Sequence, residues 1–256
     1  MPSSSPDPVR FDTEGVTVNA ASLPAMFAVG WLLGLLHLWF ALGYLFHSTY
    51  HELGHTFTAW LSGRYAFPIP ILLTIIGNER STALSAFTLV PLALGAVWAA
   101  QERRFVLAAV LASIAALGVY LSFLASEAQS RVWVTFGGCA GEFVLSALVC
   151  AAFYVELPDR LRWDFWRWPF VLVACCVLVN ADHTWRGIAS DLDRLPRGTA
   201  MEGSKDANGD MDKLLRAGWT PAEIAGAYLA LADAAWLGLG LLYGACLLQA
   251  VRRSRS

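Results

Sequence analysis

Residues 24–61 read PAMFAVGWLLGLLHLWFALGYLFHSTYHELGHTFTAWL, a long apolar run that carries the motif HELGH near its end. Between Gly15 and His51 the chain has no Asp, Glu, Lys or Arg. A bilayer-crossing helix needs about 20 apolar residues, so residues 24–46 are long enough to span a membrane. Because a helix rises about 1.5 Å per residue, one straight helix over the whole run would be too long. We therefore expect the run to bend or divide, with Gly43 as the break.

The composition of the whole chain extends this pattern. Of the 256 residues, 57% are hydrophobic and 15% are charged, and the mean hydropathy is +0.51. Soluble domains have roughly 45–50% apolar and about 25% charged residues, so the composition indicates a multi-span membrane protein. Disorder needs low hydrophobicity and high charge, which excludes it for most of the chain. A formal net charge of -2 without a concentrated basic face argues against a nucleic-acid partner.

Later apolar stretches supply the remaining expected spans. They lie at about residues 84–100, 105–126, 132–155, 169–184 and 221–250. We expect an all-α polytopic membrane protein with about six transmembrane helices, or seven if the first run divides. A polar N-terminal tail is expected at residues 1–23, a transmembrane domain at 24–251 and a basic C-terminal tail at 252–256. The absence of a visible targeting signal favours a multi-pass protein of a prokaryotic plasma membrane.

Two segments do not have the pattern of a span. Residues 65–80 are β-prone and contain a Gly-Asn turn signal near their end, which predicts a strand. Pro68 and Pro70 would keep such a strand at a sheet edge, because proline cannot donate a backbone hydrogen bond. Residues 186–218 are rich in Asp and Gly and are expected to form a polar loop.

The motif His51-Glu52-Leu53-Gly54-His55 is the main chemical signal. On a helix, residues four apart lie on one face, so both imidazoles can point at one ion. Imidazole nitrogens are good zinc ligands, and a catalytic zinc site has three protein ligands and a water. Glu52 would act as the general base that takes a proton from that water and later delivers it to the leaving amine. An ionisable cluster inside an apolar segment is costly unless it is paired or functional.

The residues around this motif resemble the site-2 protease family of intramembrane metallopeptidases. The resemblance rests on HELGH inside an apolar helix, on the following TFTAWLSG, and on the β-prone stretch after it. It implies a membrane-associated β-hairpin after the motif helix. The small-residue segment at 137–142, GGCAGE, is similar to one in a later helix of that family. The family takes its third zinc ligand from a downstream Asp, often after Asn-x-x-Pro and before Gly, a signature that this chain lacks.

Several acidic residues are therefore candidates for the third ligand. Asp210 is preferred, because an Asp that opens a helix after a glycine turn resembles the family arrangement best; a simple helix N-cap is the other interpretation. Asp191 follows, because it lies nearer the end of the fifth span. Asp182 is third and also suits a residue that supports the ligands. Glu142 is the least favoured ligand and is expected to bond polar groups near the site.

Three more ionisable residues lie in apolar surroundings. His47 precedes His51 by four residues and is a candidate to support the ligands from the same helix face. His37 is expected to be a packing histidine. Asp233 lies within the last apolar stretch, where it is either a polar contact between helices or part of a polar pathway.

Three functions follow from this pattern. The preferred one is a zinc metalloprotease that cleaves peptide bonds of membrane-protein substrates, with the segment near residues 69–76 pairing with an extended substrate at a strand edge. The second is a zinc-dependent lipid amidase or esterase, because hydrolysis needs only the same activated water. The third is a regulatory or scaffold membrane protein that binds a metal without turnover. Glu52 favours catalysis, because structural zinc sites need no general base.

Overall fold

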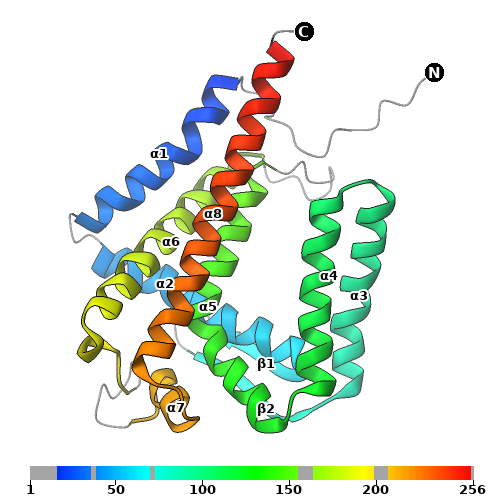
Figure 1. The fold of residues 1–256 in the computed structure, drawn as a ribbon, viewed down its shortest axis with the longest axis vertical. Coiled ribbons are helices and arrows are strands. Elements are labelled where there is room, and N and C mark those ends of the chain that lie inside the picture. The colour runs from blue at the N-terminus through cyan, green and yellow to red at the C-terminus, as the bar shows by residue number, and fades with distance from the viewer. Residues whose placement is uncertain (1–15, 36–38, 70–72, 155–163, 199–206, 255–256) are drawn as a thin grey trace. The chain divides into compact units, whose positions relative to one another are not determined.

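The computed structural model describes residues 16–35, 39–69, 73–154, 164–198 and 207–254. Within them the chain is mostly helical, with one two-stranded antiparallel sheet (Figure 1). The helices are α1 (Val16–Leu35), α2 (Trp39–Leu61), α3 (Thr82–Gln101), α4 (Phe105–Val119), α5 (Glu127–Ala152), α6 (Arg167–Ser190), α7 (Asp210–Arg216) and α8 (Pro221–Ser254). The strands are β1 (Arg64–Ile69) and β2 (Leu73–Arg80), and a π-helical turn, Tyr120–Leu124, extends α4. The mainly helical class and the small sheet agree with the expectation from the sequence.

Among the described residues, four helical segments are long and apolar enough to cross a membrane. They are Thr82–Gln101, Phe105–Leu124, Glu127–Ala152 and Pro221–Gln249. Each overlaps a stretch that the sequence predicts as a span. Many apolar side chains of α3 and α4 point outward, and Phe87 and Val106 are 77% and 79% exposed. Such apolar surfaces are expected where lipid replaces water as the solvent, so the structure is that of a membrane protein.

The first apolar run does not break where the sequence suggests. α1 ends at Leu35 and α2 begins at Trp39, whereas Gly43 lies inside α2 and does not break it. A glycine in a helix costs only about 1 kcal/mol, so its presence does not by itself end one. α1 begins at Val16, so residues 16–23 are helical and not part of a polar tail. They carry no charge, and the helix continues through Pro24, as membrane helices tolerate.

The expected polar loop at residues 186–218 is also shorter than predicted. α6 continues to Ser190, because Trp185 and Ile188 are buried and extend its apolar face. α7 begins at Asp210, within the same predicted loop. His37, Pro70 and residues 1–15 lie outside the described residues.

The chain forms two compact units. The first comprises residues 1–47, 142–190 and 226–256, and the second comprises residues 48–141 and 191–225. In the first unit α1 packs against α6, and the Tyr243 hydroxyl on α8 donates a hydrogen bond to Ala20 O at 2.5 Å. Asp233 of α8 accepts a 2.7 Å hydrogen bond from Arg186 of α6, which also bonds Asp182 at 2.9 Å. Asp233 is thus a polar contact between two helices.

In the second unit a tight turn sends the chain from α2 directly into the hairpin. Gly63 has a φ of 69°, a left-handed conformation that side chains disfavour. A Cβ there would lie 2.3 Å from Ser85 Oγ. The indole of Trp60 then donates a 3.0 Å hydrogen bond to Ala66 O, which fastens β1 to the end of α2. Pro68 pairs with Thr74 in this sheet, where both strands are edges.

A buried arginine joins the hairpin to the start of α5. Arg64 is only 2% exposed, and its guanidinium donates hydrogen bonds to Asn78 O on β2 and to the carboxylate of Glu127. Arg80 and Arg131 lie 3.4 and 3.1 Å from the same carboxylate. One glutamate therefore compensates a buried positive charge and holds three segments of the second unit together.

We predict that Glu127→Gln destabilises the protein, because it leaves the Arg64 guanidinium buried without a counter-charge. The free energy of unfolding should fall by roughly 1–3 kcal/mol, the scale of a hydrogen bond between charged groups, because glutamine keeps the acceptor oxygen but not the charge. The measurement is the melting temperature in detergent. Glu102→Gln, an exposed glutamate after α3, is the matched control and should leave it unchanged. Equal melting temperatures for both variants would contradict the prediction.

Candidate metal centre

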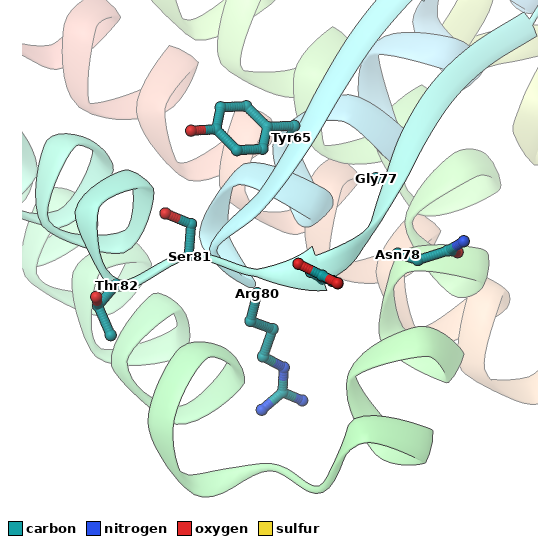
Figure 2. A pocket seen from close by; sticks show the side chains of 7 residues that line it. Tyr65, Gly77, Asn78, Arg80, Ser81 and Thr82 are labelled. Atoms are coloured by element: carbon teal, nitrogen blue, oxygen red, sulfur yellow. The ribbon is translucent and has the colours of Figure 1, made fainter.

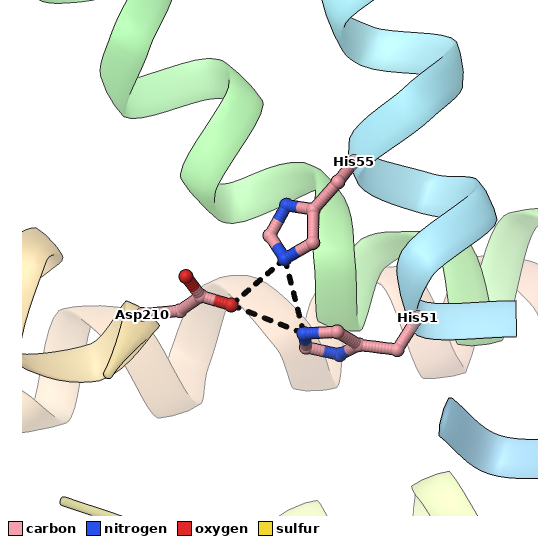
Figure 3. A group of neighbouring side chains, drawn as sticks. All are labelled: His51, His55 and Asp210. Atoms are coloured by element: carbon pink, nitrogen blue, oxygen red, sulfur yellow. Dashed lines mark hydrogen bonds and ion pairs between the residues drawn. The ribbon is translucent and has the colours of Figure 1, made fainter. Parts of the chain in front are cut away.

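The two histidines of the HELGH motif converge on one point. Both lie on α2, four residues apart, and their Nε2 atoms are 3.1 Å from each other (Figure 3). His51 is partly exposed, and His55 is 8% exposed. The shared face that the sequence predicts is therefore present.

Asp210 completes this cluster from α7. Its Oδ2 lies 3.0 Å from His51 Nε2 and 2.9 Å from His55 Nε2 (Figure 3). The residue at the N-cap of α7 is Gly209, and Asp210 is the first residue of the helix, so the simple N-cap interpretation is wrong. His51, His55 and Asp210 form a group that could hold a metal ion.

The spacing of the three atoms fits a tetrahedral ion. Zinc binds imidazole nitrogen and carboxylate oxygen at about 2.0–2.2 Å, so two ligand atoms of a regular tetrahedron lie about 3.3 Å apart. The three separations observed are 2.9, 3.0 and 3.1 Å. Small outward movements of the side chains would therefore accommodate an ion of this size between them.

The outer ring nitrogens of the histidines also have partners. His55 Nδ1 lies 2.8 Å from Val134 O on α5, and because a carbonyl only accepts, this ring nitrogen is the donor. With an ion bound, this tautomer would leave the Nε2 lone pair of His55 free to coordinate it, as metal-binding histidines require. His51 Nδ1 lies 3.7 Å from the thiol sulfur of Cys139, also on α5. The motif alone gave no signal for either partner.

Glycines of α5 leave room beside the histidines. A Cβ on Gly138 would lie 2.6 Å from the Nε2 atoms of both His51 and His55. A Cβ on Gly137 would lie 2.3 Å from Thr58 Oγ1, and one on Gly141 would lie 2.4 Å from Gly54 Cα. The small-residue segment therefore lets α5 approach α2, and at Gly138 it keeps open the space that an ion and its water need.

The surroundings of Asp210 favour the negatively charged form of its carboxyl group. Burial opposes this charge, but the adjacent His55 and His51 outweigh burial and hold the pKa of the carboxyl well below its usual range. Lys213, one turn later on α7, donates a 3.2 Å hydrogen bond to Oδ1. Asp210 therefore offers an anionic oxygen, Oδ2, to the cluster, while its other oxygen is held by a lysine.

Glu52 is bound to the hairpin. Its Oε2 accepts a 2.7 Å hydrogen bond from the Thr74 hydroxyl on β2. The hydroxyl of Thr56 donates to Glu52 O at 2.8 Å. The sequence places Thr74 in a β-prone segment, but nothing in the pattern indicates that it meets Glu52.

Asp191 and Asp182 have neighbours outside this cluster. Asp191 lies 3.0 Å from the guanidinium of Arg194, and Asp182 is paired with Arg186. Glu142 is fully buried and lies 3.3 Å from the imidazole of His47.

A second polar feature lies where the hairpin passes into α3. A pocket of about 680 Å³ is lined by Tyr65, Gly77, Asn78, Glu79, Arg80, Ser81 and Thr82 (Figure 2). The guanidinium of Arg80 donates hydrogen bonds of 2.8 and 2.7 Å to Ala125 O and Ser126 O, so it is already engaged by the segment before α5. The three clustered side chains do not line this pocket.

Comparison with known proteins adds no family: no family model, curated protein or solved structure matches the chain.

We predict that Gly138→Ala prevents metal binding, because the added methyl would occupy the space between the two Nε2 atoms. Elemental analysis of the purified protein should fall from about one zinc per chain, the stoichiometry of a single site, to near none. Gly226→Ala, at a helical glycine with open space around it, is the matched control. A Gly138→Ala protein that keeps its zinc would refute this account of the site.

We predict that Asp210→Ala and His55→Ala each lose the metal, whereas Asp191→Ala retains it. The first two remove an atom of the cluster, and the third removes only a partner of Arg194. Zinc content by elemental analysis distinguishes them. If Asp191→Ala loses zinc and Asp210→Ala retains it, the prediction is wrong and the third ligand is Asp191.

Proposed function

We propose that this protein is a zinc-dependent intramembrane endopeptidase of the kind that the site-2 protease family represents. The single observation that carries the proposal is the convergence of His51 Nε2, His55 Nε2 and Asp210 Oδ2 within 3.1 Å of one another, beside the glutamate of HELGH. Two imidazoles and one carboxylate with an open side are the donor set of a catalytic zinc site. Gly138, which has no side chain beside the two Nε2 atoms, would leave that side open.

The roles of the side chains follow from their chemistry. His51, His55 and Asp210 would hold the ion. A bound zinc would lower the pKa of a water to about 7 and polarise the scissile carbonyl. Glu52 accepts a proton from the attacking water as its oxygen bonds to the carbonyl carbon. Glu52 then donates that proton to the leaving nitrogen as the carbon–nitrogen bond breaks.

The substrate class follows from the surroundings of the site. The described residues contain four helices that could cross a membrane, and we propose that the chain crosses about six times, in a prokaryotic plasma membrane. Its substrates would then be membrane proteins whose cleaved segment unwinds locally. Within the described ranges the sheet has two strands, so each would offer an outer edge to which an extended polypeptide could add. The polar pocket at the end of β2 would receive the continuation of such a segment.

We predict that Glu52→Gln retains zinc but loses peptide cleavage, because the amide cannot accept the proton of the attacking water. Loss of a general base reduces the rate by about 10²–10⁴-fold. The assay is cleavage of fluorescently labelled casein, an unfolded polypeptide, by the purified protein in detergent, with zinc content measured in parallel. Glu102→Gln serves as the matched control, because it makes the same change outside the site.

The same preparations separate the proposed protease from the alternatives. A zinc-loaded wild type that cleaves an N-acyl amide or ester lipid but not casein would indicate the lipid hydrolase. A zinc-loaded wild type that cleaves neither would indicate a metal-binding protein without turnover. Casein cleavage that survives unchanged in Glu52→Gln would contradict the proposed base.

A further inference from the structure

The hydroxyl of Thr74 lies between the hairpin and the motif helix. Thr74 belongs to β2, and its side chain is directed at α2, whereas the neighbouring Leu73 and Ile75 are exposed on the other face of the strand. Its Oγ1 is 2.7 Å from Glu52 Oε2, 2.8 Å from Glu52 O and 3.4 Å from Thr56 Oγ1. Its neighbours are therefore two acceptor oxygens of Glu52 and one further hydroxyl.

The number of available protons assigns these hydrogen bonds. A threonine hydroxyl has one proton to donate. Glu52 O already accepts the proton of Thr56, whose Oγ1 is 2.8 Å away. Thr74 therefore donates its proton to Glu52 Oε2. This oxygen is the nearer of the two acceptors and belongs to a charged group, which forms the stronger hydrogen bond. A hydrogen bond lowers the basicity of the oxygen that accepts it, so Oε1 is the better proton acceptor of the two Glu52 oxygens.

We propose that Thr74 is a positioning residue for the general base: it holds Oε2 of Glu52 so that Oε1 is presented to the water. The proposal rests on the proposed function, because a base needs positioning only where there is a proton to transfer. Proton transfer depends on hydrogen-bond reach of about 2.6–3.2 Å, so a carboxylate free to rotate would lose part of its rate.

The location of Thr74 makes the base depend on the hairpin. β1 is fastened to α2 by the Trp60–Ala66 hydrogen bond, and the hairpin is fastened to α5 by Arg64. Thr74 is carried by the same two-stranded sheet whose outer edges would accept an extended substrate. The residue thus links the element that would bind a polypeptide to the carboxylate that would act on it.

Thr74→Val tests this role, because valine keeps the shape and the strand preference of threonine but has no hydroxyl. We expect zinc content to be unchanged and kcat for casein to fall roughly tenfold or more, the rate equivalent of one hydrogen bond to a charged group. KM should stay within about twofold of wild type, because the hydrogen bond acts on the base and not on substrate binding. Thr74→Ser should restore most of kcat.

Two further measurements separate positioning from a general structural effect. Thr88→Val on α3 removes a hydroxyl that donates to Leu84 O in its own helix, and should leave kcat unchanged. Combining Thr74→Val with Glu52→Ala gives a double-mutant cycle on the melting temperature. This cycle measures the interaction between the two side chains independently of enzymatic activity. We expect the Thr74→Val effect on melting to shrink once the Glu52 carboxylate is absent.

The outcomes distinguish this role from the proposed function. A zinc-loaded wild type that does not cleave casein would overturn both. An active wild type together with a Thr74→Val enzyme of wild-type kcat would overturn only the role of Thr74. A kcat loss that Thr74→Ser does not restore, or additive melting effects in the cycle, would also overturn it.

Discussion

The close approach of α2 and α5 is the contact on which the candidate metal centre depends. A Cβ on Gly141 would lie 2.4 Å from the Cα of Gly54, far inside the distance at which two carbon atoms can pack. Only glycines at these positions let the two backbones come so near. One consequence is that Val134 O reaches Nδ1 of His55 and fixes its tautomer. Another is that Gly138 faces both histidines with no side chain of its own. An ordinary side chain at any of these glycines would move α5 away or fill the site.

The electrostatics of the site follow from its donor set. Two neutral imidazoles and one carboxylate bring a single negative charge, so a divalent ion would leave a net positive charge to polarise water and a carbonyl. Asp210 comes from α7, which is remote in sequence from α2, so an ion held by all three residues would also stabilise the fold that brings these segments together. Lys213 occupies the second oxygen of the carboxylate and favours coordination through Oδ2.

The hairpin is joined to the site by two kinds of contact. Arg64 and Glu127 anchor it to the start of α5 through a buried charge, and Trp60 anchors it to the end of the motif helix. Thr74 then brings a hydroxyl to the Glu52 carboxylate. Because the strand that presents Thr74 also has an outer edge, substrate pairing and base placement would use one rigid element. Such support of a reacting group by a neighbouring element is what keeps a catalytic geometry within fractions of an ångström.

The sequence by itself determined the class of the chain and half of the site. Apolar runs predicted helices at α3 to α6 and α8, β-prone residues predicted a strand where the hairpin lies, and the four-residue spacing of His51 and His55 placed them on one face, because these are local properties of the backbone. The choice of Gly43 as the break failed, because where a helix ends depends on its neighbours. The meeting of Asp210 with the histidines, the partners Val134 and Thr74, and the space at Gly138 were decided only by the tertiary structure. Each of these joins residues at least 20 positions apart, and no local pattern records which distant atoms will pack together.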